Sequence, residues 1–228
     1  MGTSNSSSRQ IVLLQLRLGA IAWILALQFF LAQIIVAFAW STPFSLAARF
    51  ISDLGNTACA FYPSGSNTFV CSPLHLGMNA SFMLLGLTMI TGAVLTRDAF
   101  SPGWQRAAAI VLFAMAGFGV ILVGLYPENE NITRHATGAG LNFVAGNLSL
   151  VLFGVALSPI ARRRSLSRFS IAAGTLGMVA TGLFVSERYL GLGPGGMERL
   201  AAYPIPIWQI VTGLAFWHSA IGPAGPPK

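Results

Sequence analysis

The sequence predicts an all-α integral membrane protein, a bundle of six transmembrane helices with short loops and both termini in the cytoplasm. Three observations predict this class. The 228 residues are 54% hydrophobic and only 8% charged, whereas a soluble domain carries about 25% charged residues. Six apolar stretches of about 18–23 residues are each long enough to cross a hydrocarbon core. The basic residues also divide unequally between the two sides that six crossings create.

The apolar stretches define one transmembrane domain over residues 18–222, between short cytoplasmic tails at 1–17 and 223–228. Backbone polar groups in lipid must be satisfied within each segment, so we expect each stretch to be a helix. The first stretch is longer than the roughly 7–15 apolar residues of a secretory signal, so it counts as a helix too. The predicted spans are about 18–40, 76–95, 107–126, 141–160, 169–186 and 205–222, and none contains Asp, Glu, Lys or Arg.

The distribution of basic residues predicts the orientation. If the N-terminus is inside, the inner connections and tails hold nine basic residues and the outer connections hold four. The nine are Arg9, Arg17, Arg97, Arg106, Arg162, Arg163, Arg164, Arg168 and Lys228, and the four are Arg49, Arg134, Arg188 and Arg199. The positive-inside rule therefore places both termini in the cytoplasm. This bias accounts for the net charge of +7, and no basic face beside aromatic platforms indicates nucleic-acid binding.

The two cysteines, Cys59 and Cys71, lie in the longest connection, about 41–75, which also has room for a short amphipathic helix. The predicted topology puts this connection outside, where disulfides persist. The sequence therefore predicts a disulfide, with two unpaired thiols as the alternative.

Acidic residues and imidazoles gather at the outer ends of the spans. Five of the six carboxylates are there, together with two of the three histidines. Histidine and carboxylate side chains exchange protons near neutral pH, so this end is a candidate acid–base site. The candidate catalytic residues are Asp53, His75, Glu128, Glu130 and His135. The alternative is a helix cap or turn for Asp53 and a solvated loop for Glu128, Glu130 and His135. For His75 the alternative is a hydrogen bond to a loop carbonyl.

Other polar residues at the same end are candidates for substrate binding. Asn79 and Asn142 follow the two histidines on the same predicted helix faces. Two Glu-Arg pairs, Glu187 with Arg188 and Glu198 with Arg199, bracket a glycine-rich connection. An arginine can bind a lipid phosphate through two hydrogen bonds. Pairing with neighbouring carboxylates is the alternative role.

The cofactor is not defined by the sequence, and a divalent metal remains an open alternative. Asp53, His75 and His135 are the candidate ligands. The third histidine, His218, falls at the inner end, so a three-histidine site is excluded under this topology. The spacing that characterises zinc proteases is also missing.

Several short motifs carry a family resemblance: "ISDLGN", a histidine opening the second span, "GLYPENENITRHATGAG" and the late Glu-Arg pair. The chain resembles a prokaryotic family of six-helix membrane proteins catalogued only as a domain of unknown function, number 998 in that series. The resemblance covers most of residues 15–220 and implies a six-helix protein of the bacterial cytoplasmic membrane. More distantly, "ISD" is similar to the FRAG/DRAM/SFK group, whose members are linked to lipid and autophagy processes.

The alkaline ceramidase superfamily offers a weaker likeness. Its serine–histidine element is loosely similar to the stretch Ser72-Pro73-Leu74-His75. The paired histidines of its last helix are missing here, where only His218 is present. That difference argues against its zinc-hydrolase mechanism.

The interpretation favoured by these residues is a membrane-embedded enzyme that acts on a lipid or isoprenoid by acid–base chemistry, with or without a metal. It could be a lipid hydrolase or transferase, or an isoprenoid cyclase. The alternative is a non-catalytic membrane protein that binds a lipid or small molecule. A transporter ranks lowest, because ionisable residues deep in the spans are almost absent from the sequence. Membrane lipids are the expected partners.

Overall fold

The computed structural model describes residues 3–40, 43–62 and 68–221. Its helices are α1 (Thr3–Ile24), α2 (Leu27–Phe38), α3 (His75–Leu95), α4 (Trp104–Leu125), α5 (Ile132–Leu141), α6 (Asn147–Leu157), α7 (Arg164–Val185), α8 (Gly193–Ala202) and α9 (Pro204–Ile221). Short helical turns are η1 (Ser52–Gly55), η2 (Arg97–Ala99), η3 (Asn142–Gly146, of π type) and η4 (Ala161–Arg163). Two strands, β1 (Ala60–Tyr62) and β2 (Thr68–Val70), pair antiparallel.

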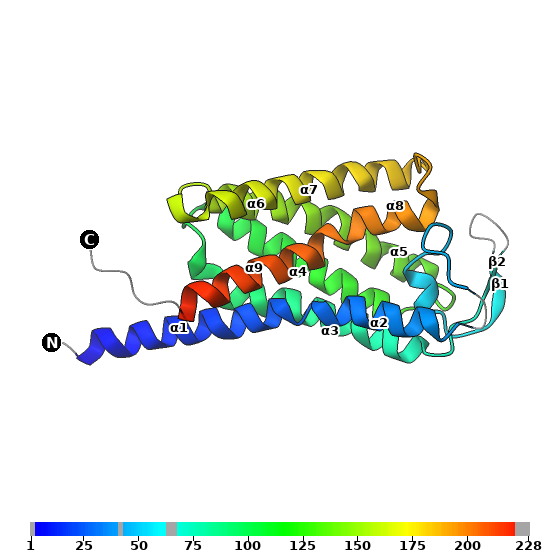
Figure 1. The fold of residues 1–228 in the computed structure, drawn as a ribbon, viewed down its shortest axis with the longest axis horizontal. Coiled ribbons are helices and arrows are strands. Elements are labelled where there is room, and N and C mark those ends of the chain that lie inside the picture. The colour runs from blue at the N-terminus through cyan, green and yellow to red at the C-terminus, as the bar shows by residue number, and fades with distance from the viewer. Residues whose placement is uncertain (1–2, 41–42, 63–67, 222–228) are drawn as a thin grey trace.

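Successive elements join into long apolar helices that lie side by side as a bundle (Figure 1). Among the described residues, six stretches are long and apolar enough to cross a membrane. They are Gln10–Phe38, His75–Leu95, Trp104–Leu125, Ile132–Leu157, Ala161–Val185 and Gly193–Ala220. The chain is therefore an integral multi-pass membrane protein. Both ends of the described chain lie at one end of the bundle, opposite the hairpin of β1 and β2 (Figure 1).

Four helices begin earlier than the sequence suggests, and one of them is α7, which begins at Arg164 instead of about 169. The first helix begins at Thr3, within the segment assigned to a tail. The fourth begins at Ile132 instead of about 141, so His135 lies on it. The last apolar stretch begins at Gly193 instead of about 205, because α8 precedes α9 with only Tyr203 between them. The predicted tail at 223–228 lies outside the described residues.

An aromatic core fills the bundle on the side of the termini. It consists of Trp23, Phe100, Phe113, Phe153, Trp208 and Phe216. Trp208 stacks on Phe153 with ring centroids 5.0 Å apart and meets Trp23 edge-on at 4.9 Å. These rings are at most 2% exposed, and such pairs stabilise beyond the area that they bury. This aromatic core joins the first, third, fourth and last spans.

The opposite end of the bundle is closed by the long connection between α2 and α3. In its described part it forms η1 and the hairpin of β1 and β2, and the amphipathic helix expected there is reduced to η1. Residues 51–56 are buried against the helices. Cys59 and Cys71 form the predicted disulfide across the base of the hairpin. We call this the hairpin end, and the opposite one the terminal end.

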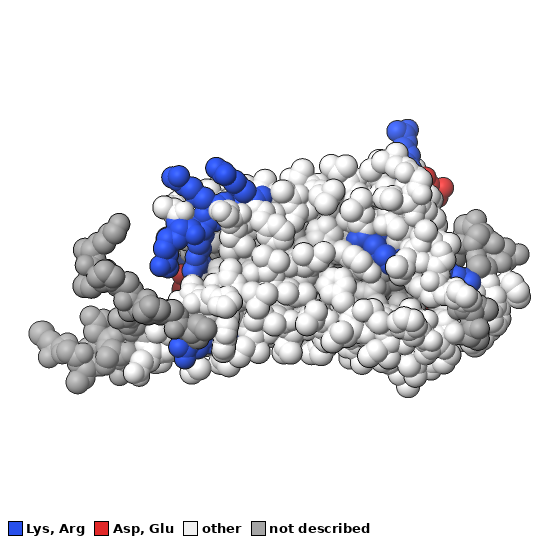
Figure 2. Space-filling model, in the orientation of Figure 1, with Lys and Arg blue, Asp and Glu red and all other residues white. Residues whose placement is uncertain are grey.

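Charge on the surface is concentrated at the terminal end (Figure 2). Arg162, Arg163 and Arg164 lie there at the start of α7, with Arg168 one turn later. The long flank seen in Figure 2 is mostly uncharged, as expected of a surface that faces lipid. Exposed apolar side chains such as Ile35 and Phe38 of α2 fit the same environment.

Candidate functional site

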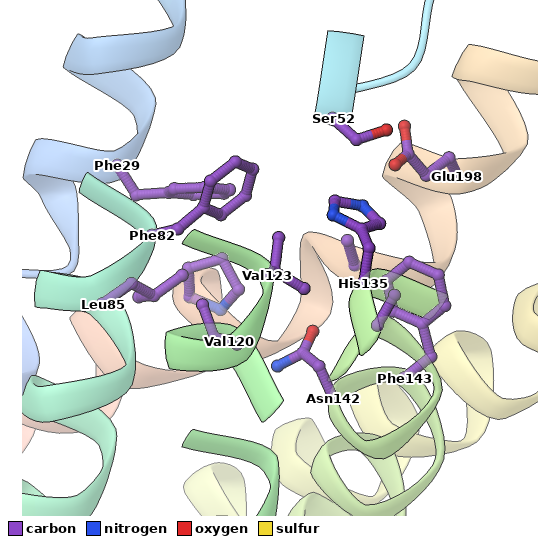
Figure 3. A pocket seen from close by; sticks show the side chains of 13 residues that line it. Phe29, Ser52, Phe82, Leu85, Val120, Val123, His135, Asn142, Phe143 and Glu198 are labelled. Atoms are coloured by element: carbon purple, nitrogen blue, oxygen red, sulfur yellow. The ribbon is translucent and has the colours of Figure 1, made fainter. Parts of the chain in front are cut away.

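A small chamber of about 50 Å³ lies inside the bundle, at its hairpin end. Four polar side chains line it, those of Ser52, His135, Asn142 and Glu198. Apolar side chains form the remaining wall, including Phe29, Phe82, Leu85, Val120, Val123 and Phe143. In Figure 3 the imidazole of His135 points towards Ser52 and Glu198, with Phe29 and Phe82 across the chamber. Such an apolar cavity with a few converging polar groups is typical of a ligand or active site.

Close backbone contact positions His135. Its helix α5 packs on α4, and a side chain at Gly138 would place its Cβ only 2.5 Å from the carbonyl oxygen of Gly119. Only glycines allow the two helices to approach this closely. The side chain of Asn131 caps α5 by accepting a hydrogen bond from the backbone N–H of Arg134 at 3.0 Å. The imidazole therefore stands at a fixed place on the first turn of the fourth span.

The hydrogen bond at Nδ1 indicates the tautomer of His135. Its Nδ1 lies 3.0 Å from the carbonyl oxygen of Tyr126. A carbonyl can only accept, so Nδ1 carries the hydrogen and Nε2 of the neutral ring keeps a lone pair. His135 is 7% exposed, and its ring lines the chamber. The imidazole is thus arranged to accept a proton at Nε2.

Two carboxyl groups, Asp53 and Glu128, lie together behind Ser52. Glu128 accepts hydrogen bonds from the Ser52 hydroxyl at 2.8 Å and from the Asn56 amide at 3.0 Å. Asp53 accepts one from the backbone N–H of Phe50 at 2.9 Å, and its other oxygen, Oδ1, is buried without a partner in the described structure. Burial and the charge of Glu128 raise the pKa of Asp53 to about 7. Asp53 can therefore gain or lose a proton near neutral pH.

A third carboxylate, Glu198, reaches the chamber from α8. It is 8% exposed and accepts a hydrogen bond from the backbone N–H of Ile51. Helix α8 docks on the connection before η1, where the N–H of Gly195 donates to the carbonyl of Ala47 at 2.9 Å. A side chain at Gly195 would meet the carbonyl oxygen of Arg49 at 2.0 Å, so only glycine permits this contact. The docking holds Glu198 against η1.

The structure separates the remaining sequence candidates from the chamber. His75 bonds through Nδ1 to the carbonyl of Ser72 at 2.9 Å. Glu130 is exposed and accepts a hydrogen bond from the Thr57 hydroxyl at 2.8 Å. Glu187 and Arg188 are exposed at the end of α7.

The two candidate asparagines have different places. Asn79 is buried, and its amide donates to the carbonyl of Gly55 at 2.9 Å, so it anchors η1 to α3. Asn142 lines the chamber at the start of the π-type turn η3. Turns of this type are frequent at functional sites.

The candidate metal ligands do not form a cluster. In the part of the chain that the structure describes, no group of three or more His, Cys, Asp or Glu side chains is arranged to hold a metal ion. Asp53 and His135 belong to the chamber region, whereas His75 faces the backbone of Ser72. The geometry does not assign these three residues to a common metal.

The helix that carries Glu198 and Arg199 was not predicted from the sequence. The stretch "GLGPGG" before these two residues indicates a loop, but both lie buried on α8. Pro194 in the first turn of α8 is a helix-start signal. Met197 and Ala201 are spaced one turn apart and are buried, as a helix face requires. These signals could have placed the helix.

The chain matches the model of one protein family. This family is described as "Protein of unknown function (DUF998)", and the match covers residues 24–215. The chain belongs to this family. The DUF998 match includes every chamber residue named above. No curated protein and no solved structure matches the chain significantly.

Proposed function

We propose that this DUF998 protein is a membrane-embedded enzyme that acts on a lipid or isoprenoid by acid–base chemistry in the chamber. The observation that carries the proposal is the position of His135 and Glu198 in the chamber wall, with the carboxyl groups of Asp53 and Glu128 directly behind Ser52 of the same wall. Burying ionisable groups costs free energy, so proteins concentrate them where they work. A purely structural role would be filled more cheaply by apolar side chains.

The roles of the residues follow from their hydrogen bonds. His135 Nε2 is the proton acceptor, because Nδ1 already donates to Tyr126. The Asp53–Glu128 pair is the proton donor, and the Ser52 hydroxyl connects Glu128 to the chamber. Glu198 and Asn142 orient the reacting group. The chamber of about 50 Å³ holds a water molecule or the reacting end of a substrate, since a water needs about 10–15 Å³ by the same measure.

We further infer that the hairpin end faces the outside of a bacterial cytoplasmic membrane, with both termini inside. Support comes from the arginines gathered at the terminal end. The disulfide at the hairpin end is a second, independent support, because disulfides persist in oxidising compartments. The substrate would then approach from the outer leaflet.

Lipid profiling tests the proposed enzyme. Cells that produce the parent protein are compared with cells that produce His135→Ala or Glu198→Gln at equal membrane levels. We expect the parent to change the abundance of at least one lipid class, and both variants to lose that change, because removing an acid–base group slows such reactions by about 10²–10⁴-fold.

Matched controls keep the experiment specific. His218→Ala and Asp98→Asn remove the same kinds of side chain at the terminal end, where both residues are exposed. They are expected to behave as the parent does. A lipid complement that is identical in parent and His135→Ala cells would leave non-catalytic binding of a lipid or small molecule as the better account.

A further inference from the structure

A second cavity, separate from the chamber, opens on the flank of the bundle. This groove, of about 780 Å³, lies between α2 and the junction of α8 with α9. Phe30, Ile34 and Phe38 form an apolar wall along it, and Trp40 and Arg199 stand among its polar lining. Ile34 and Phe38 are 53% and 87% exposed, so the groove is open to the surrounding lipid. Its volume falls in the range of small-molecule sites, about 300–1,000 Å³.

The groove has unpaired hydrogen-bond donors and no unpaired acceptor among its described buried atoms. The indole Nε1 of Trp40 is buried without a partner, and so are Nε and Nη2 of Arg199. The other polar groups are satisfied, since Tyr203 donates to Gln33 at 2.8 Å. Buried donors without partners cost free energy. All three donors belong to residues that line the groove, and they indicate a ligand that brings acceptor oxygens.

The charge of Arg199 points in the same direction. Its side chain is 7% exposed, and Nη1 alone donates to the carbonyls of Leu46, Arg49 and Gly195 at 2.7–2.9 Å. No carboxylate of the described chain lies within 4.0 Å of its guanidinium. A buried cation without a direct ion pair is costly, and guanidinium matches phosphate geometry closely.

We propose that the groove binds a phospholipid with an exposed phosphate monoester, whose phosphate rests on Arg199 and Trp40 and whose hydrocarbon chain follows Phe30, Ile34 and Phe38. The ring of Phe44 lies 5.7 Å from the centre of the Arg199 guanidinium. It moves aside when the phosphate reaches the two buried nitrogens. A chain in this position stays in contact with membrane lipid along its length.

This inference rests on the proposed function and extends it, because it names the class of lipid and the place beside the chamber where the lipid binds. Arg199 lines the groove and its neighbour Glu198 lines the chamber. The same relation holds for Tyr203 and Ala202. Groove and chamber therefore lie on two sides of the same short helix, and the head group of the bound lipid is held next to the acid–base residues.

Binding is measured without turnover, by calorimetric titration of the purified full chain in detergent micelles. The probe is dioctanoyl phosphatidic acid, and dioctanoylglycerol and inorganic phosphate are the comparison ligands. We expect the probe to bind the parent at least about tenfold more tightly than either comparison ligand, because only the probe uses both the charge and the chain. Equal binding of dioctanoylglycerol would overturn the phosphate assignment, and equal binding of inorganic phosphate would reduce the site to one for the free ion.

Two variants test the location. Arg199→Gln removes the charge, and Ala37→Trp fills the groove wall without touching the hydrogen bonds of Arg199. Both should weaken binding by about tenfold or more. Arg134→Gln, an exposed arginine of α5 at the same end, should bind as the parent does.

Ala37→Trp decides the test if Arg199→Gln does not fold, because Arg199 also holds three backbone carbonyls. Unchanged binding by a folded Ala37→Trp would overturn the inference. His135→Ala should bind normally, so a failure of the catalytic proposal leaves this binding result intact, and the reverse also holds.

Discussion

The aromatic core and the chamber are both buried in the same bundle, but they are formed by different kinds of side chain. In the aromatic core, rings such as Trp23 and Trp208 fill the interior completely. In the chamber, one carboxyl group, an imidazole, a hydroxyl and an amide share the wall with apolar side chains around a space that the chain leaves open. The first arrangement stabilises the bundle, and the second costs stability that the rest of the fold must supply. The difference shows that the residues that stabilise the bundle and the candidate acid–base residues lie at different positions along the helices.

The largest expected effect tests the aromatic core. Trp208→Ala should lower the free energy of unfolding by about 3–5 kcal/mol, because it opens a large cavity and removes the hydrogen bond from the indole to Ser170 at 2.7 Å. Denaturation of the purified protein in detergent measures this change. Trp104→Ala, where the ring is 69% exposed, is the matched control. Losses of similar size in both variants would contradict the special role of the aromatic core.

The disulfide should contribute slightly less. Replacing Cys59 and Cys71 by serine removes a crosslink between residues 12 apart in sequence, which is worth about 3 kcal/mol by chain entropy. The double variant should therefore have a lower melting temperature than the parent. Treatment of the parent with a reducing agent should lower its melting temperature by the same amount. The double variant should then show no further response to the reductant, and a second decrease would mean that the reductant acts elsewhere.

A pH effect should distinguish the chamber region from the rest of the protein. Burial and Glu128 raise the pKa of Asp53 from 3.8 to about 7. The folded state therefore binds this proton more tightly than the unfolded chain does, so stability from this group is complete below pH 4 and is lost as the pH rises to about 7. The slope should reach at most about 1.4 kcal/mol per pH unit. Asp53→Asn should flatten it, and a parent-like slope in that variant would refute the assignment.

The smallest effect is expected at the terminal end. Asp98 lies 3.7 Å from Arg97 and 3.8 Å from Arg106, with half of its side chain exposed. Exposed ion pairs contribute about 0–1 kcal/mol. Asp98→Asn should therefore change the free energy of unfolding by less than about 1 kcal/mol and leave the pH slope in place. A larger loss would show that charge at this end is structural after all.

The six-helix architecture was predictable because lipid imposes long uncharged runs, which a single sequence displays directly. The residues at which the helices begin were harder to predict. His135 and Glu198 lie on helices that begin at Ile132 and Gly193, where glycine, proline and charged residues indicate loops. Tertiary contacts override those local signals, such as the docking of Gly195 on Ala47.

The sequence predicted the type of candidate site and its end of the bundle, but it did not predict which residues form the site. Composition placed the acidic residues at one end, and Asp53, Glu128 and His135 lie together there. It could not separate His75 from them, because the backbone contact of His75 with Ser72 depends on how the connection folds. The sequence offered Arg199 as a residue that could bind a lipid phosphate, but it gave no sign of the groove, because Trp40 and Arg199 are far apart in sequence.

Helix α8 has only ten residues, and its adjacent side chains Glu198 and Arg199 belong to different compartments. Because this short helix separates the groove from the chamber, a change in its position alters both cavities. Any substitution that rotates or tilts it moves the carboxylate and the guanidinium together. A substitution in α8 that widens the groove for the hydrocarbon chain therefore also shifts the acid–base residues of the chamber. Substitutions in α2 can widen the groove without this side effect.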